Sequence, residues 1–199
     1  NGVRTVEDIH IARYRLGSDG REIVAASMID KANPLFNIPT TCVIAGSPES
    51  SYSSTLFCPP GALSFHEMLI LIGTWQEGGR LRWETSDKIV MEPDISTRGA
   101  IEGAVAEMPD GRFLMVMRGS NAGNLSLPGY KWWCFSSDGC RTWSEPKPWA
   151  YSDGTPFHSP SSYSTILRHS DGEYYWVGNI CEGNPDGNEP DYPLVIGSI

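Results

Sequence analysis

The 199-residue sequence predicts an all-β protein made of short antiparallel strands joined by tight turns. Asp-Gly pairs occur six times, and several of them separate two apolar runs. Such a pair between apolar segments is the strongest short-range signal for a β-hairpin. Glycine (21) and proline (15) are plentiful, and no window of helical length shows a clean 3.6-residue period. These observations together favour strands and turns over long helices.

The predicted strands follow from apolar runs bounded by turn residues. In chain order they are residues 8–16, 22–29, 40–45, 67–73, 80–85, 104–108, 113–117, 130–136, 163–167, 174–177 and 193–198. The two best-defined hairpins turn at Asp110-Gly111 and at Asp171-Gly172. Residues 8–29 are expected to form a further hairpin of their own.

The strands group into repeating units at residues 62–95, 101–149 and 160–199. Antiparallel sheets that repeat at ~40–50 residues are typical of the blades of a β-propeller. A β-sandwich, which also uses short strands and Gly/Pro-rich turns, is the alternative. At ~45–50 residues per blade the chain holds about four blades. We therefore expect residues 1–199 to be a single β-propeller domain or a segment of one, with open sheet edges that favour self-association.

Composition excludes several classes of function. A net charge of −9 argues against nucleic acids and anionic membrane surfaces as partners, and no apolar stretch approaches the ~20 residues of a membrane span. The five cysteines form no Cys-x-x-Cys pair, so neither a zinc site nor a thioredoxin motif is predicted. Cys134 and Cys140 flank one turn and could pair across it; buried free thiols are the alternative.

Residues 136–143 carry the most informative motif of the chain. Its defining residues are Ser136, Asp138, Gly139, Thr142 and Trp143. Asp-Gly is a tight-turn pair, the hydroxyl groups can hydrogen-bond across the turn, and the indole can pack beneath it. The motif resembles the Asp box of sialidases (neuraminidases) and related Asp-box repeat β-propellers, where it is structural and not catalytic. It departs from that pattern at Cys140, where the box usually has a second glycine.

Glu102 and Arg118 stand at the two ends of one predicted hairpin, 16 residues apart. A strand, a two-residue turn and a return strand bring both ends to the same edge, so we expect these side chains to be neighbours at one mouth of the propeller. Long charged side chains at inner strand ends line the central funnel, the usual ligand site of this architecture. The alternative is a solvated surface ion pair worth ~0–1 kcal/mol.

A glutamate, a hairpin, an arginine and an Asp box in this order resemble the sialidase family, well over residues 101–149 and loosely over 160–199. The resemblance implies a six-bladed β-propeller glycoside hydrolase that needs no cofactor and no metal. It implies that Glu102 polarises a tyrosine nucleophile, an exception among glycosidases. It also implies that Arg118 is one of three arginines that grip the carboxylate of the substrate.

Other parts of the family's site fall outside the match. Its first arginine and its acid/base aspartate would lie upstream of the chain, and its tyrosine beyond the last residue. The third arginine is expected near residues 184–194, which contain none; Asp191 stands about where it would be and would repel a carboxylate. Arg98 lies four residues before Glu102 and is a further candidate for substrate binding, with a solvated loop arginine as the alternative.

Histidine and aromatic residues give weaker signals. Four scattered histidines form no metal pattern, so His158 is expected to be a plain loop residue. Tyr163 is expected to pack in the core or at a rim. Sugar stacking is open to Trp132, Trp133, Trp149 and Trp176, for which core packing is the default.

These features lead to three hypotheses. The first is a sialidase-like exo-glycoside hydrolase that acts on terminal sugars of glycans, with Glu102 assisting proton transfer and Arg118 binding an anionic or polar substituent. Under it, Glu102→Gln is expected to lower kcat far more than it changes folding. The second is a carbohydrate-binding Asp-box propeller without catalysis, and the third a structural repeat domain. The resemblance alone implies a secreted or periplasmic protein.

Overall fold

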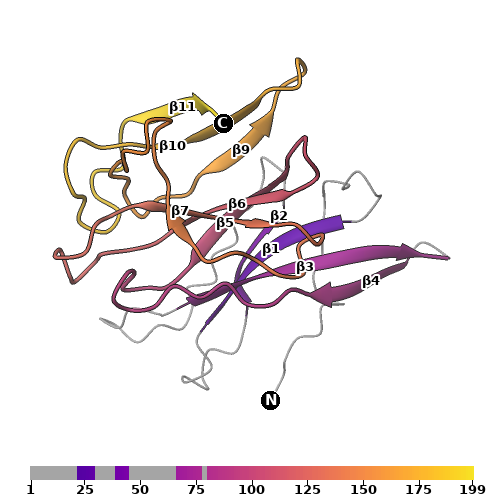
Figure 1. Cartoon of the computed structure of the whole chain (residues 1–199). Helices are drawn as coiled ribbons and strands as arrows, with labels where there is room; N and C mark the ends of the chain where they lie inside the picture. Colours follow the sequence, from indigo (N-terminus) through magenta and orange to yellow (C-terminus); the bar gives the residue numbers. More distant parts are fainter. Residues whose placement is uncertain (1–21, 30–38, 45–65, 78–79) are drawn as a thin grey trace.

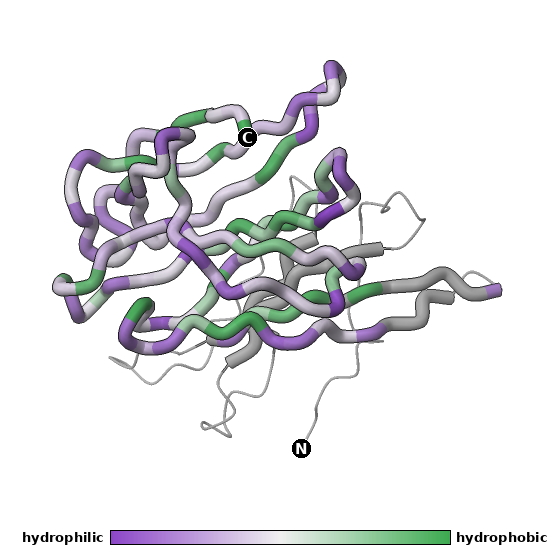
Figure 2. Tube along the Cα trace, viewed as in Figure 1, coloured by the Kyte–Doolittle hydropathy of each residue, from purple (hydrophilic) through white to green (hydrophobic). Residues whose placement is uncertain are grey.

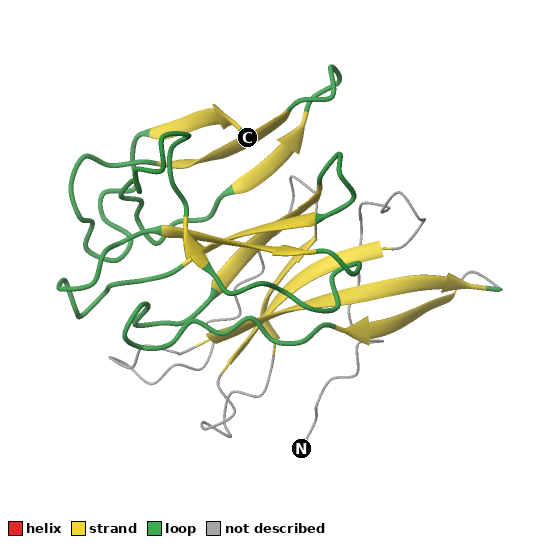
Figure 3. Cartoon of the chain, viewed as in Figure 1, coloured by secondary structure: helices red, strands yellow, loops and turns green. Residues whose placement is uncertain are grey.

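The computed structural model describes residues 22–29, 39–44, 66–77 and 80–199 (Figure 1). Within these ranges the chain is all-β, with eleven strands and no helix (Figure 3). No helix able to cross a membrane is therefore found in the described part of the chain. The strands form three antiparallel sheets.

The first sheet has the order β2-β1-β3-β4. Its strands are β1 (Glu22–Ile29), β2 (Pro39–Ile44), β3 (His66–Gln76) and β4 (Arg80–Thr85). β1 pairs with β2 along one edge and with β3 along the other. This corrects the predicted hairpin of residues 8–29, because both edges of β1 are taken by other strands; the predicted strand 8–16 lies outside the described residues.

The second and third sheets follow the chain order more simply. The second contains β5 (Ile101–Glu107), β6 (Phe113–Arg118), β7 (Lys131–Ser136) and β8 (Lys147–Pro148), and the third contains β9 (Thr165–Arg168), β10 (Tyr174–Asn179) and β11 (Leu194–Ser198). Their orders are β5-β6-β7-β8 and β11-β10-β9. The predicted Asp-Gly turns join β5 to β6 and β9 to β10, and Gly111 and Gly172 have φ values of 81° and 97° that favour glycine.

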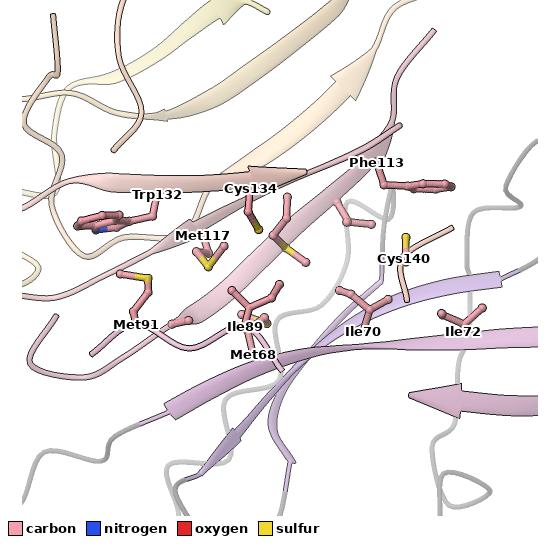
Figure 4. Close-up of a cluster of buried hydrophobic side chains, with 13 residues drawn as sticks. Met68, Ile70, Ile72, Ile89, Met91, Phe113, Met117, Trp132, Cys134 and Cys140 are labelled. Carbon is pink, nitrogen blue, oxygen red and sulfur yellow. The ribbon is translucent and has the colours of Figure 1, made fainter. Parts of the chain in front are cut away.

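The middle sheet, β5–β8, buries both of its faces. One face packs on β3 through a cluster that includes Ile70, Met115 and Cys134 (Figure 4). The other face, with Leu114 and Val116, packs on the third sheet. Successive residues of a strand point to opposite faces, so the uninterrupted apolar run of β6 supplies both cores. In Figure 2 hydrophobic residues run along these strands and hydrophilic ones gather at the turns.

The third sheet is covered on one face only. Ile166 and Trp176 point into the core shared with the middle sheet. On the opposite face Leu167, Leu194 and Ile196 are 45%, 69% and 65% exposed. The tryptophans predicted to pack do so: Trp132 and Trp176 are buried, and Trp133 and Trp149 are partly buried against the core.

The Asp box closes the end of the middle sheet that lies farthest from Arg118, since Phe113 pairs with Ser136 and Arg118 with Lys131. The Asp138 carboxylate accepts hydrogen bonds from the Ser136 hydroxyl at 2.8 Å, and from the backbone N–H and hydroxyl of Thr142 at 2.9 and 2.7 Å. Burial alone would raise the pKa of Asp138, but these hydrogen bonds lower it to about 2. The predicted turn chemistry is confirmed.

Two neighbours complete the box. Trp143 packs beneath the turn against the buried cluster of the first two sheets. Cys140 has a φ of 70°, in the left-handed region that favours glycine, the residue that the Asp-box pattern usually has at this position. Cys134 and Cys140 are both buried and are not joined by a disulfide, so the predicted alternative of thiols is correct.

Asp138→Ala is expected to lower the free energy of unfolding by about 1 kcal/mol, because the carboxylate is exposed and solvent screens part of its hydrogen bonding. Urea unfolding at pH 7 measures this. The loss should be present above about pH 4 and vanish toward pH 2, because the folded pKa of about 2 lies below the ordinary 3.8. Asp153→Ala, which removes one hydrogen bond from a simpler turn, is the matched control and should cost less. Equal losses in the two variants would contradict a special role for the box.

Candidate functional site at the Glu102–Arg118 rim

A β-bulge at the start of β5 places Glu102. Ile101 pairs with Arg118 and Ala104 with Val116, so Glu102 and the next residue share one partner on β6. Glu102 has a φ of 51°, which a non-glycine residue adopts only at some cost in energy. Its carboxylate is turned inward, and the residue is only 8% exposed. Strained backbone of this kind is concentrated at functional sites, so the bulge makes this rim a candidate functional site.

Glu102 and Arg118 form the predicted pair. Arg118 Nη2 donates to Glu102 Oε1 at 2.9 Å, and Nε lies 2.9 Å from Oε2 without the alignment of a hydrogen bond. Arg118 Nη1 donates to the carbonyl of Ser161. The two side chains are 10% and 11% exposed, which excludes the alternative of a solvated surface pair. Burial lowers the pKa of Arg118, and the charge of Glu102 opposes that shift.

Lys131 is a buried cation that sequence reasoning missed. It opens β7 directly opposite Arg118 and is 0% exposed. Its Nζ donates to the carbonyl of Pro160 at 2.9 Å, to the carbonyl of Ser162, and to the Ser162 hydroxyl at 3.2 Å. Burial, followed by the charge of Arg118, lowers the pKa of Lys131 to about 7. The only signal in the sequence is a lysine at the head of an otherwise apolar, aromatic strand.

Residues 159–162 lie in the segment that connects β8 of the middle sheet to β9 of the third sheet. The side chains of Arg118 and Lys131 donate to backbone carbonyls of this segment. Asn179, at the end of β10, holds the same segment through two serine hydroxyls. The Ser159 hydroxyl donates to the Asn179 backbone carbonyl at 2.5 Å, and the Ser162 hydroxyl donates to Asn179 Oδ1 at 2.8 Å. Buried polar residues at this rim include Glu102, Ser120, Asn121, Lys131, Ser159, Ser161, Ser162, Ser164 and Asn179. A hydrogen-bonded network of this kind fixes the positions of its charged members before any ligand arrives.

Arg98 and Asp191 add opposite charges to the rim. The positive charge of Arg98 lowers the pKa of Arg118 and the negative charge of Asp191 raises it, so both lie within electrostatic range of that guanidinium. Arg98 is half-buried, its Nε is buried without a hydrogen-bond partner, and it forms no ion pair with any described residue. Arg98 thus brings a second guanidinium within electrostatic range of Arg118. Asp191 is exposed.

Tyr163 stands at the rim beside Glu102. It is 37% exposed. Burial raises its pKa, hydrogen bonding with Thr165 lowers it, and the charge of Glu102 raises it further. Of the two predicted positions for Tyr163, core or rim, its exposure fits the rim, and the sequence did not predict the electrostatic effect of Glu102. No group of three or more potential metal ligands occurs among the residues that the structure describes.

No family model matches the chain, and no curated protein matches it. Among solved structures, the chain is similar to a crystal structure of a protein of unknown function from Dyadobacter fermentans, with 16% identity and a TM-score of 0.49. The match covers 82% of this chain and 32% of the other, so the chain spans about a third of that protein's length.

Proposed function

We propose that the protein is a sialidase-like exo-glycoside hydrolase that acts on terminal sugars of glycans. The observation that carries the proposal is the buried Glu102–Arg118 ion pair, set on a strained bulge at the rim opposite the Asp box. The three face-packed antiparallel sheets of the described residues are of the kind that forms propeller blades, and a sialidase-type six-bladed propeller is part of this proposal. Remaining blades, or a second copy, would cover the exposed face of the third sheet. A secreted or periplasmic location belongs to the same proposal.

The roles of the rim residues follow from their chemistry. Arg118 and Arg98 would bind an anionic substituent of the sugar, since guanidinium groups stay charged and bind carboxylates through two N–H donors. Arg98 is the less engaged of the two in the free protein, because Arg118 already donates to Glu102 and to the Ser161 carbonyl, whereas Arg98 forms no ion pair with any described residue. Glu102, whose carboxylate pairs with Arg118, would accept the proton of the attacking group. Lys131 would hold the segment 159–162 and thereby the orientation of Arg118.

A binding module without catalysis is the second candidate, and Asp191 favours it. Its carboxylate acts on both Arg118 and Lys131, in the stretch where the family resemblance calls for an arginine. A negative charge there weakens the attraction for a second carboxylate. Such a rim would suit a glycan with a polar terminal sugar, held but not cleaved.

Release of 4-methylumbelliferone from its glycosides tests the first proposal. We expect turnover of a substrate with an anionic terminal sugar, N-acetylneuraminic or glucuronic acid, and less with galactose or glucose. Glycan-array binding without release from any glycoside would replace the hydrolase with the binding module. Neither binding nor release would overturn both proposals.

Arg98→Ala is expected to raise KM for the anionic glycoside by about 10- to 100-fold, the effect of losing one charge-assisted contact. Since Arg98 is half-buried and makes no ion pair with a described residue, the free energy of unfolding should change by less than about 1 kcal/mol. Arg112→Ala, at the far turn of the β5–β6 hairpin, is the matched control and should leave KM unchanged. An unchanged KM in Arg98→Ala would remove Arg98 from the site.

A further inference from the structure

A pocket of about 660 Å³ lies between two loops, residues 151–158 and 180–193. The first loop follows β8 and the second follows β10. Both strands end at the rim that carries Arg118, since β8 ends beside the start of β7 and the end of β10 is bound to the segment that Lys131 holds. The aromatic side chains of the lining are Tyr151, Phe157 and Tyr192, and its side chains with polar chemistry include His158, Cys181 and Glu182. The volume is within the range of small-ligand sites.

The wall of this pocket is fixed by two asparagine side chains. Asn121, 1% exposed, donates from Nδ2 to the carbonyl of Pro185 at 2.7 Å and accepts at Oδ1 from the N–H of Gly187 at 2.9 Å. Asn184 accepts at Oδ1 from the N–H of Gly129 at 2.7 Å. The loop therefore holds its shape in the free protein, which reduces the entropy lost on binding a ligand.

His158 brings a polar group with spare capacity. Its ring stacks on Tyr130, with centroids 5.5 Å apart and planes 24° apart. Its carbonyl accepts from the N–H of Cys181 at 3.0 Å. Its Nδ1 is buried and has no hydrogen-bond partner among the described residues. A buried polar atom without a partner is uncommon in native proteins, so His158 marks this side of the pocket as unusual.

The chemistry of the lining selects the class of ligand. No lysine or arginine lines the pocket, whereas Glu182 does, so an anionic ligand is disfavoured. Tyr151 and Tyr192 are 50% and 71% exposed. Exposed aromatic faces on a fixed loop suit the C–H face of a sugar ring, and a carboxylate and an imidazole suit its hydroxyls.

We propose that this pocket binds a neutral sugar ring, the one adjoining the terminal sugar held at the Arg118 rim. The two sites are neighbours, because the pocket residue His158 lies two residues before Pro160, whose carbonyl accepts from Lys131 Nζ at 2.9 Å. Asp191, between the pocket residues Pro190 and Tyr192, acts on Arg118 and Lys131. The charge of Lys131 acts on the pocket residue Cys181. The proposed function supplies the terminal sugar; affinity of the pocket for a neutral saccharide does not depend on it.

Titration of the full chain with lactose, cellobiose and maltose, followed by saturation-transfer NMR, tests the pocket. We expect at least one disaccharide to bind, and Tyr192→Ala to weaken it by about fivefold or more. Glu182→Gln, the second variant, should weaken it less. Both side chains are exposed, so the variants should fold. Tyr175→Ala, on β10 and outside the lining, is the matched control and should bind normally.

The outcomes separate this proposal from the function on which it builds. Disaccharide binding that Tyr192→Ala weakens and Arg98→Ala leaves unchanged supports the pocket, even if no glycoside is hydrolysed. Hydrolysis of an anionic glycoside together with no binding of any of the three disaccharides overturns the pocket and keeps the enzyme. Binding that Tyr192→Ala does not affect also overturns it.

Discussion

Glu102→Gln is expected to lower kcat for release of an anionic terminal sugar by at least about 100-fold, the usual contribution of a positioned general base. Glutamine keeps the shape of the side chain but cannot take up a proton. The measurement is kcat with the best glycoside of the panel, at pH values from 5 to 8. Glu145→Gln, an exposed glutamate near the Asp box, is the control and should keep full turnover. Turnover within a few-fold of wild type would remove Glu102 from the chemistry.

The same variant should also lose stability, which revises the expectation from the sequence. Glu102 is the carboxylate that compensates the buried Arg118, and breaking a buried ion pair on one side typically costs about 3–5 kcal/mol. The Ser161 carbonyl keeps one hydrogen bond to Arg118, and the strained φ at position 102 remains. We therefore expect a loss near the lower end, about 3 kcal/mol, in urea unfolding. Kinetics must be compared at a temperature where both proteins are folded.

Lys131→Met is expected to remove the rise in the free energy of unfolding that Lys131 gives the wild-type protein between about pH 7 and pH 10.5. The folded protein releases the Lys131 proton near pH 7, whereas the unfolded chain keeps it to about 10.5. Between these values the unfolded state binds more protons, so the stability of the wild type rises with pH. Below pH 7 both states are charged and the cost of burying the ammonium is present in full. The three oxygen acceptors of Nζ favour the charged form and limit the gain.

The difference in unfolding free energy between wild type and Lys131→Met should therefore shift in favour of the wild type, by roughly 3 kcal/mol from pH 7 to pH 10. The charged groups that act on Lys131 are Arg118, Glu102, Asp191 and Cys181. Since Cys181 titrates above 9.0, the comparison is made in a Cys181→Ser background. Lys131→Arg stays charged throughout and should show no such shift. A difference that is constant with pH would contradict a neutralised Lys131.

Local signals in the sequence predicted local structure well. Strands at 22–29 and 80–85 have the predicted bounds, and the other predicted strands that fall within the described residues lie within a few residues of an observed one. β8 was missed because two residues, one of them a proline, carry no period. The partner of β1 was predicted wrongly, since strand order depends on contacts between residues distant in the chain. The Glu102–Arg118 contact was predictable because one hairpin fixes it.

The rest of the site depends on tertiary packing. The sequence spacing of Lys131 and Ser162 does not predict that the lysine side chain donates to the Ser162 carbonyl in the segment between β8 and β9. The pocket is equally hidden, because its wall is set by Asn121 and Pro185, which are 64 residues apart. The left-handed backbone of Glu102 has no sequence signal at all, since glycine follows it and does not occupy the position itself.

Ser161 sits between the rim and the pocket wall in a way that links their occupants. Its carbonyl accepts from Arg118, and its N–H donates to the carbonyl of Gly187 at 2.7 Å. An anion bound by Arg118 would compete with the Ser161 carbonyl for the same guanidinium, and Ser161 is also the residue whose N–H holds the Gly187 carbonyl. The two halves of a glycan would then bind with cooperativity, and by thermodynamic reciprocity a saccharide in one subsite would change the affinity of the other by the same factor.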